Sequence, residues 1–183
     1  MTVLGSAEIR RRILEEGLIT GYIDLDTQLQ PNGFDLCVEN VFTFTEAGEI
    51  DYSNKNRHIP KIAVMTPDEN GIWFLPQGAY AIGIKEKINL PSDIKAEANL
   101  IMGDSIHRST VMRCGCVMAS GRWDVGYSGM GRSLLVVHNP YGLKLHKHGR
   151  LIQIKFYRVE NVDKAYEGDY QNETYHQDGG GTR

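Results

Sequence analysis

After one helical segment, the chain consists of short runs of β-branched and aromatic residues that are separated by clusters of Gly, Pro, Asn and Asp. The runs that we predict as strands are Val41–Thr45, Gly71–Leu75, Gly78–Ile84, Arg132–Val137 and Leu151–Val159. Turn clusters lie between them at Glu46–Gly48, Pro67–Gly71 and Asn139–Gly142. Many short strands without alternating long helices favour a mainly β fold, an antiparallel sandwich or barrel.

The one helix predicted from the sequence lies at the N-terminal end. Ser6 can cap it, and Gly17 can end it. Ile9, Ile13 and Leu14 are expected to share its apolar face. The charged positions are expected to form a solvated face rather than a nucleic-acid patch: Arg10–Arg12, Glu15 and Glu16.

Size and charge limit the organisation of the chain. Its 183 residues predict one domain, residues 1–160, followed by a polar tail, residues 161–183. Composition leaves two readings of that tail open, disorder or an arm that closes over a ligand. The net charge of −3 argues against a nucleic-acid partner. We expect no membrane span. Because the three cysteines are expected to be free thiols and the first residues do not form a secretory signal, we expect a cytoplasmic protein.

Common catalytic and metal-binding signatures are absent from the sequence. Cys37, Cys114, Cys116 and the six His lack the paired spacing of a metal site. Neither a nucleophile elbow nor a glycine-rich phosphate loop occurs. A metal held by the protein is therefore not expected.

Two segments are unusually rich in groups that suit a phosphorylated ligand. Residues 104–113 contain two Arg and three hydroxyl side chains, which can converge on one anion. Taken alone, a polar surface turn explains that segment equally well. Asp124 lies in the Gly-bounded segment Gly121–Gly129, where it can form a turn or act as a general base.

Four segments, in order along the chain, resemble the motifs of the dUTPases. The first motif ends in G-(Y/F)-D-L, the second is R-S-S, the third is G-x-(I/V)-D-x-x-Y-x-G and the fourth is G-x-R-(I/V)-(A/G)-Q-L. Their counterparts are Pro31–Leu36, Arg108–Thr110, Gly121–Gly129 and Gly149–Ile154. The resemblance implies a dUTPase-like distorted β-barrel or jelly-roll with a short N-terminal helix.

The extended second motif, from Arg108 to Arg113, is closer to the dCTP deaminase branch of the same superfamily. Deamination in that branch relies on a Glu about ten residues after the motif Asp. Here that place is Leu134, or Val136 if a two-residue insertion is allowed, and neither side chain can carry a proton. The stretch from Trp123 to Val137 looks like the archaeal dUTPases, which share the deaminase scaffold without its Glu.

The resemblance implies hydrolysis of dUTP to dUMP and pyrophosphate in a homotrimer whose sites lie between subunits. Asp124 would activate the attacking water, and Mg²⁺ would be held mainly by the triphosphate. Asp35 would support the metal or the active-site loop indirectly, without contacting the substrate. Backbone groups of residues 120–122 would read the base. The residues implied in substrate binding are Arg108, Ser109, Thr110, Arg113, Tyr127, Gln153, Tyr166 and Tyr170.

Three other functions stay open at this point. A dCTP deaminase, with or without dUTPase activity, would need an acid placed elsewhere, such as Glu160. An inert nucleotide-binding protein of the same fold would bind dUTP without cleaving it. A β-barrel binding module unrelated to the family would require the four ordered motifs to be coincidental.

Overall fold

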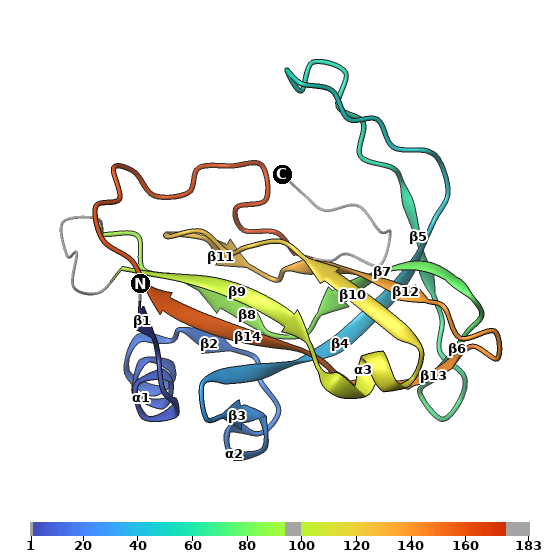
Figure 1. The fold of residues 1–183 in the computed structure, drawn as a ribbon, viewed down its shortest axis with the longest axis horizontal. Coiled ribbons are helices and arrows are strands. Elements are labelled where there is room, and N and C mark those ends of the chain that lie inside the picture. Colours follow the sequence, from blue (N-terminus) through green and yellow to red (C-terminus); the bar gives the residue numbers. More distant parts are fainter. Residues whose placement is uncertain (1, 94–99, 175–183) are drawn as a thin grey trace.

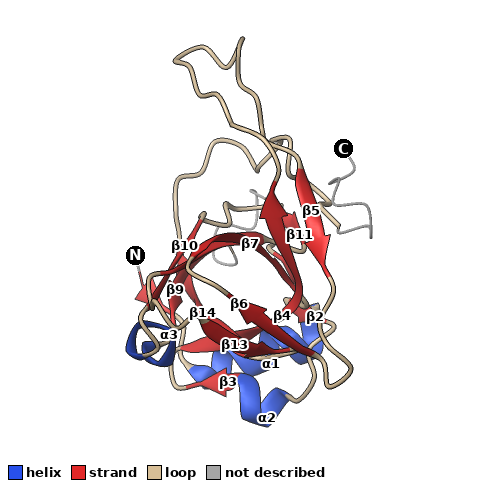
Figure 2. Cartoon of the chain, turned by 90° about the vertical axis from the view of Figure 1, so that its right-hand side faces the viewer, coloured by secondary structure: helices blue, strands red, loops and turns tan. Residues whose placement is uncertain are grey.

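A strongly curled antiparallel sheet forms the body of the molecule in the computed structural model, which describes residues 2–93 and 100–174. Figure 2 shows the sheet wrapping into a half-barrel, with α1 and α2 below it. The expected mainly β fold is confirmed. The central path of the sheet runs in the order β1 (Thr2–Val3), β14 (Arg150–Arg158), β4 (Gly33–Phe44), β7 (Gly78–Ile84), β12 (Arg132–Val137) and β10 (Cys116–Ser120).

Further strands extend this sheet and add two small ones. Off the central path, β3 (Leu29–Gln30) and β5 (Ile62–Met65) pair with β4, and β9 (Ile101–His107) pairs with β14. A three-stranded sheet has the order β11 (Ser128–Gly129), β8 (Lys87–Asn89) and β2 (Ile19–Thr20). A two-stranded sheet joins β13 (Leu143–His146) to β6 (Ile72–Leu75). The predicted strands are all found, with shifts of about one residue at their ends except for β4.

The strand β4 is much longer than the run of aromatic and β-branched residues that predicted it. It begins at Gly33, where a Cβ atom would lie 2.7 Å from the carbonyl oxygen of Ile154 in β14. Residues 33–38 are all buried, because both faces of this part of the strand are covered. The alternating pattern that signals a half-exposed strand is therefore missing there.

The helix α1 (Ser6–Glu16) ends at Gly17 as predicted, with a left-handed φ of 67°. The start of the helix differs from the prediction that the Ser6 side chain caps it. The N-cap is Gly5, no side chain caps the helix, and the Ser6 amide instead donates to the Pro31 carbonyl at 2.9 Å. Leu14 is 63% exposed, so it does not share the buried face of the helix. At 100° per residue, it lies about 140° from Ile9 around the helix axis.

Arg12 also contradicts the prediction of a fully solvated charged face. Its side chain is completely buried and pairs with Glu8 at 2.9 Å and Glu16 at 3.0 Å. Arg12 lies three residues after Ile9, which places it on the buried side of the helix. Arg10 and Arg11 remain partly exposed and pair with acidic neighbours.

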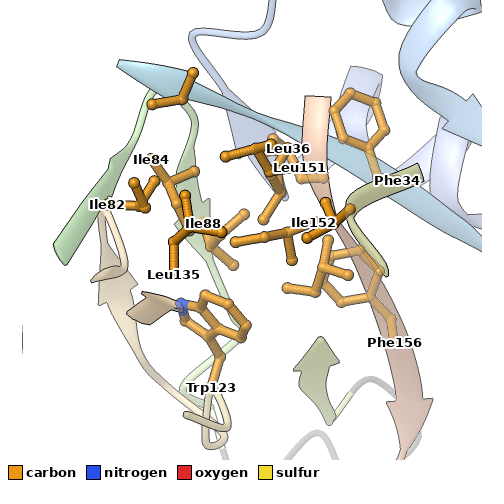
Figure 3. Packing of buried hydrophobic residues seen from close by; sticks show 14 of the residues in the cluster. Phe34, Leu36, Ile82, Ile84, Ile88, Trp123, Leu135, Leu151, Ile152 and Phe156 are labelled. Carbon is orange, nitrogen blue, oxygen red and sulfur yellow. The ribbon is translucent and has the colours of Figure 1, made fainter. Parts of the chain in front are cut away.

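One continuous apolar core fills the inside of the curled sheet. Side chains of β4, β7, β12 and β14 meet there, as the close-up of Figure 3 shows for Leu36, Ile82, Leu135 and Ile152. Trp123 closes one end of the core at 4% exposure. The loop that carries Asp124 is thereby fixed to the core through the residue next to it.

An arm made of residues 45–61 rises from the body between β4 and β5 (Figure 1). It is tied across by mutual backbone hydrogen bonds between Glu49 and His58, both 2.9 Å. The two remaining helices are short, α2 (Leu25–Gln28) and α3 (Ser109–Arg113). Of the helices within residues 2–93 and 100–174, none has the length and apolar character needed to cross a membrane.

Candidate active site

The loop that follows β10 holds Asp124 at the surface of a cavity. Trp123 and Gly103 of β9 exchange two backbone hydrogen bonds of 2.8 and 2.9 Å, which fix the start of the loop. The Asp124 carbonyl accepts from the Tyr127 amide at 3.0 Å and closes a turn in which Gly126 has a φ of 84°. The Asp124 side chain is exposed, whereas Trp123 and Val125 beside it are buried.

A cavity of about 360 Å³ brings together four of the predicted site residues, Asp124, Tyr127, Tyr166 and Tyr170. Ser120, Gly121 and Arg122, which were expected to read the base, line the same cavity. Apolar lining comes from the base of the arm and the strands next to it: Phe44, Ile59, Pro60, Ile62 and Ala81. The cavity therefore combines an exposed acid, aromatic rings and apolar side chains, a combination typical of small-molecule sites.

The C-terminal segment, defined here as residues 162–174, covers the Asp124 loop. The Tyr166 amide donates to the Val125 carbonyl at 2.7 Å, and the Asn172 amide donates to the Ser128 carbonyl at 2.7 Å. The Tyr166 ring meets the Tyr127 ring edge-on, with centroids 5.8 Å apart. Burial raises the pKa of Tyr127, so its hydroxyl stays protonated at neutral pH. The rest of the predicted tail, residues 175–183, lies outside the described residues.

A second group of predicted residues gathers around Asp35 in β4. The fully buried Asp35 carboxylate faces the Arg108 Nε at 3.1 Å and accepts from the Gln153 Nε2 at 3.4 Å. Arg150, which we did not predict, lies at 3.2 Å through its Nη1. Burial raises the pKa of Asp35, and the two guanidinium groups with the Gln153 amide oppose that shift. The cluster holds Arg108 in one orientation at the end of β9.

The predicted phosphate-binding residues after Arg108 lie on α3. Ser109, Thr110 and Arg113 have exposed side chains, while Val111 anchors the helix in the core. Arg108, at the N-cap, keeps 30% of its side chain exposed. A basic and hydroxyl-rich surface is therefore presented next to the Asp35 cluster.

The two groups lie toward opposite ends of β9. Trp123, next to Asp124, pairs with Gly103, whereas Arg108 follows the last residue of the strand. Arg108 lies five positions beyond Gly103 along this extended chain, about 16 Å at 3.2–3.4 Å per residue. Among the described residues of this one chain, Arg108 is not one of those that line the cavity with Asp124.

The structure adds a carboxylate to the cavity that the sequence analysis missed. Glu173 reaches the cavity from the C-terminal segment and pairs with Arg132 of β12 at 3.3 Å. Leu134, one candidate for the position of the deaminase Glu, lines the same cavity with an alkyl side chain. Arg150 is part of the fourth motif and could have been found from it, but no local pattern marks Glu173.

Metal-ligating side chains do not cluster in the part of the chain that the structure describes. Among residues 2–93 and 100–174, no group of three or more His, Cys, Asp or Glu is placed to hold an ion. Cys37, Cys114 and Cys116 are free thiols, and burial raises the pKa of Cys37 to about 12.

The four motif segments therefore lie on one curled antiparallel sheet and on the loops and short helix at its edges. The chain belongs to the dCTP deaminase-like family, whose profile matches residues 3–159. An Archaeoglobus fulgidus protein named "Probable deoxyuridine 5'-triphosphate nucleotidohydrolase" is 40% identical over 94% of this chain and 98% of its own length. The Methanocaldococcus jannaschii protein named "Deoxyuridine 5'-triphosphate nucleotidohydrolase" is 30% identical over 80% and 88%.

A solved structure supports the fold independently of these sequence relatives. The 2'-deoxycytidine 5'-triphosphate deaminase of Agrobacterium tumefaciens superposes with a TM-score of 0.62 at 19% identity. The match covers 84% of this chain and 47% of the deaminase chain, so this chain spans about half the length of that protein.

Proposed function

We propose that this chain hydrolyses dUTP to dUMP and pyrophosphate. The observation that carries the proposal is the cavity lined by the exposed Asp124, by Tyr127 and by a set of apolar side chains. The names of the relatives from Archaeoglobus fulgidus and Methanocaldococcus jannaschii support the same substrate. In this proposal the enzyme acts on a free nucleotide in the cytoplasm, and neither a nucleic acid nor a membrane takes part in the reaction.

In this proposal Asp124 orients a water molecule and accepts its proton as the water attacks the α-phosphorus. An exposed carboxylate on a loop that is anchored by Trp123 suits a base of this kind, because its position is fixed while its oxygens stay accessible. Tyr127 lies under the deoxyribose and leaves no space for a 2′-hydroxyl. Backbone groups of residues 120–122 bind the edge of the base.

The phosphate groups are bound by Arg108, Ser109, Thr110 and Arg113 of a second copy of the chain. The separation of about 16 Å along β9 supports this arrangement, as does the position of Arg108 outside the set of described residues that line the Asp124 cavity. A homotrimer with sites between subunits satisfies the requirement. Gln153 and Asp35 then act behind Arg108 and keep its guanidinium aimed at the phosphates.

Magnesium fits these residues as an ion bound mainly by the triphosphate. The Asp35 oxygens already face Arg108, Arg150 and Gln153, and no metal-ligating cluster occurs among the described residues. When bound, the ion would neutralise phosphate charge, which lowers the barrier to attack by water. Of the three acidic residues Asp35, Asp124 and Glu173 discussed here, Asp124 is exposed, Asp35 is buried and Glu173 is partly buried, so the Asp124 carboxylate is the most accessible to a bound nucleotide.

Deamination of dCTP is the second candidate, because Glu173 places a carboxylate in the same cavity as Leu134. Its ion pair with Arg132 opposes that role, since a proton carrier at the cytosine amine would have to leave the guanidinium.

A product assay separates the two reactions. The protein is incubated with dUTP or with dCTP in Mg²⁺, and the nucleotides are resolved by ion exchange. Release of dUMP and pyrophosphate from dUTP alone is the expected result. Conversion of dCTP to a uracil nucleotide would establish the deaminase, and binding of dUTP without turnover would identify a nucleotide-binding protein.

A further inference from the structure

Glu173 lines the proposed substrate cavity although the residue belongs to the C-terminal segment. Its side chain is 12% exposed, and its Oε1 lies 3.3 Å from the Arg132 Nη2. The Arg132 guanidinium also lies over the Phe42 ring, 5.8 Å from its centroid. Arg132 is therefore held by β12 and by an aromatic ring of β4, and it offers a fixed cation to the segment that covers the cavity.

Backbone and amide contacts lead up to this ion pair along the segment. Gln171 accepts from the Ser128 amide at 3.0 Å and donates through its side chain to the Gly126 carbonyl at 2.9 Å. The Glu173 carbonyl accepts from the Met130 amide at 2.9 Å. The side chain of Glu173 thus comes at the end of a series of hydrogen bonds to the loop that carries Asp124 and Tyr127.

We propose that Arg132 and Glu173 form an anchor that holds the C-terminal segment over the substrate cavity, which makes Glu173 a positioning residue for the reaction. This inference rests on the proposed dUTP hydrolysis. Glu173 does not contact the reacting atoms. It acts through the segment that places Tyr166 against Tyr127 and Tyr170 at the cavity wall.

A second ion pair on the same segment provides a matched comparison. Asp169 pairs with Arg57 of the arm, outside the cavity, with side chains that are 53% and 32% exposed. Exposed pairs contribute little because water and salt screen them, whereas the loss of one partner of a largely buried pair leaves a poorly solvated charge. The inner pair is therefore expected to control closure of the segment, and the outer pair is not.

The first test measures closure without any nucleotide. Hydrogen exchange is followed at the amides of Met130, Tyr166 and Asn172, which donate between the loop and the segment. Glu173→Gln should raise their exchange rates about tenfold, while Asp169→Asn should change them less than twofold. The Trp123 amide, which bonds to Gly103 rather than to the segment, reports whether the rest of the loop is intact.

The second test measures the consequence for the reaction. Glu173→Gln should raise KM for dUTP about tenfold with a smaller change in kcat, because the variant affects retention of the substrate rather than the attack of water. A charge-exchanged protein, Arg132→Glu with Glu173→Arg, should recover part of the lost affinity. A general loss of structure would not raise KM while leaving kcat nearly unchanged, and it would not be reversed by the charge exchange.

Unchanged exchange and unchanged KM in Glu173→Gln would overturn the anchor, as would equal effects of the Glu173 and Asp169 variants. If Glu173→Gln does not fold, Glu173→Asp takes its place, and wild-type exchange rates in that variant would also overturn the proposal. A wild-type protein that does not cleave dUTP would refute the proposed function alone, since the exchange measurement needs no substrate.

Discussion

Replacing Arg108 by Gln tests whether the Asp35 cluster presents a phosphate-binding guanidinium. The loss of one partner of a buried ion pair costs about 3–5 kcal/mol when the remaining charge is left uncompensated. Here Arg150 stays 3.2 Å from the same Asp35 oxygen, and the Arg108 side chain is itself 30% exposed. We therefore expect the free energy of unfolding to fall by only about 1–2 kcal/mol.

That loss corresponds to a melting temperature lowered by roughly 2–8 °C for a domain of this size. It should also depend on pH. Burial already raises the pKa of Asp35 above 3.8, and removal of a neighbouring cation raises it further. The deficit in stability should therefore be largest near neutral pH and shrink as the pH falls and Asp35 becomes protonated in the folded state.

Binding of the nucleotide should suffer more than stability. Hydrogen bonds to charged groups contribute about 1.5–3 kcal/mol each, so the Kd for a non-hydrolysable dUTP analogue should rise roughly 10- to 150-fold. Isothermal titration calorimetry measures the affinity, and urea unfolding between pH 4 and pH 8 measures the stability. An unchanged Kd in a folded variant would remove Arg108 from the phosphate site and refute the reasoning.

Three further outcomes follow from the same geometry. Asp124→Asn should abolish turnover of dUTP and keep the Kd within about tenfold, because the base acts mainly in the transition state; a variant that remains active would show that another group is the base. Gly126→Ala should speed exchange of the Tyr166 amide and lower stability by about 1–2 kcal/mol, since Gly126 has a φ of 84° and its added Cβ would lie 2.7 Å from the Ala165 Cβ. Burial raises the pKa of Glu86, so this residue lowers the free energy of unfolding as the pH rises above 4.5. Urea unfolding of Glu86→Gln should show a flatter decline with pH, and an equal slope would assign the decline to other groups.

Local patterns predicted much of the secondary structure. Strands β7 and β12 were predicted with their observed bounds, because Pro76 precedes β7, while β12 has turn residues on both sides and alternates in burial along its length. The end of α1 at Gly17 followed from the tolerance of glycine for a left-handed φ. The start of that helix did not, because the Ser6 amide bonds to a carbonyl of residue 31, which is distant in the sequence.

The motif residues were identified from the sequence, but their grouping was not. Asp124 and Tyr127 share a cavity with Tyr166 and Tyr170 because the C-terminal segment folds back over the loop. Arg108 instead joins Asp35, about 70 residues earlier in the chain, through the pairing of β14 with both β4 and β9. A pattern of residue types records which groups are available, and strand pairing determines which of them meet.

By itself, the sequence determined that this protein is a mainly β domain with one N-terminal helix, and that the motif residues of the dUTPases are present in order. These features depend on neighbours within a few positions, where periodicity and turn chemistry act. Only the tertiary structure decided that Arg12 is buried, that Glu173 lines the cavity and that Arg108 pairs with Asp35 instead of lining the cavity with Asp124. Each of these depends on contacts between segments that are distant in the sequence, and their geometry is set by the curl of the sheet.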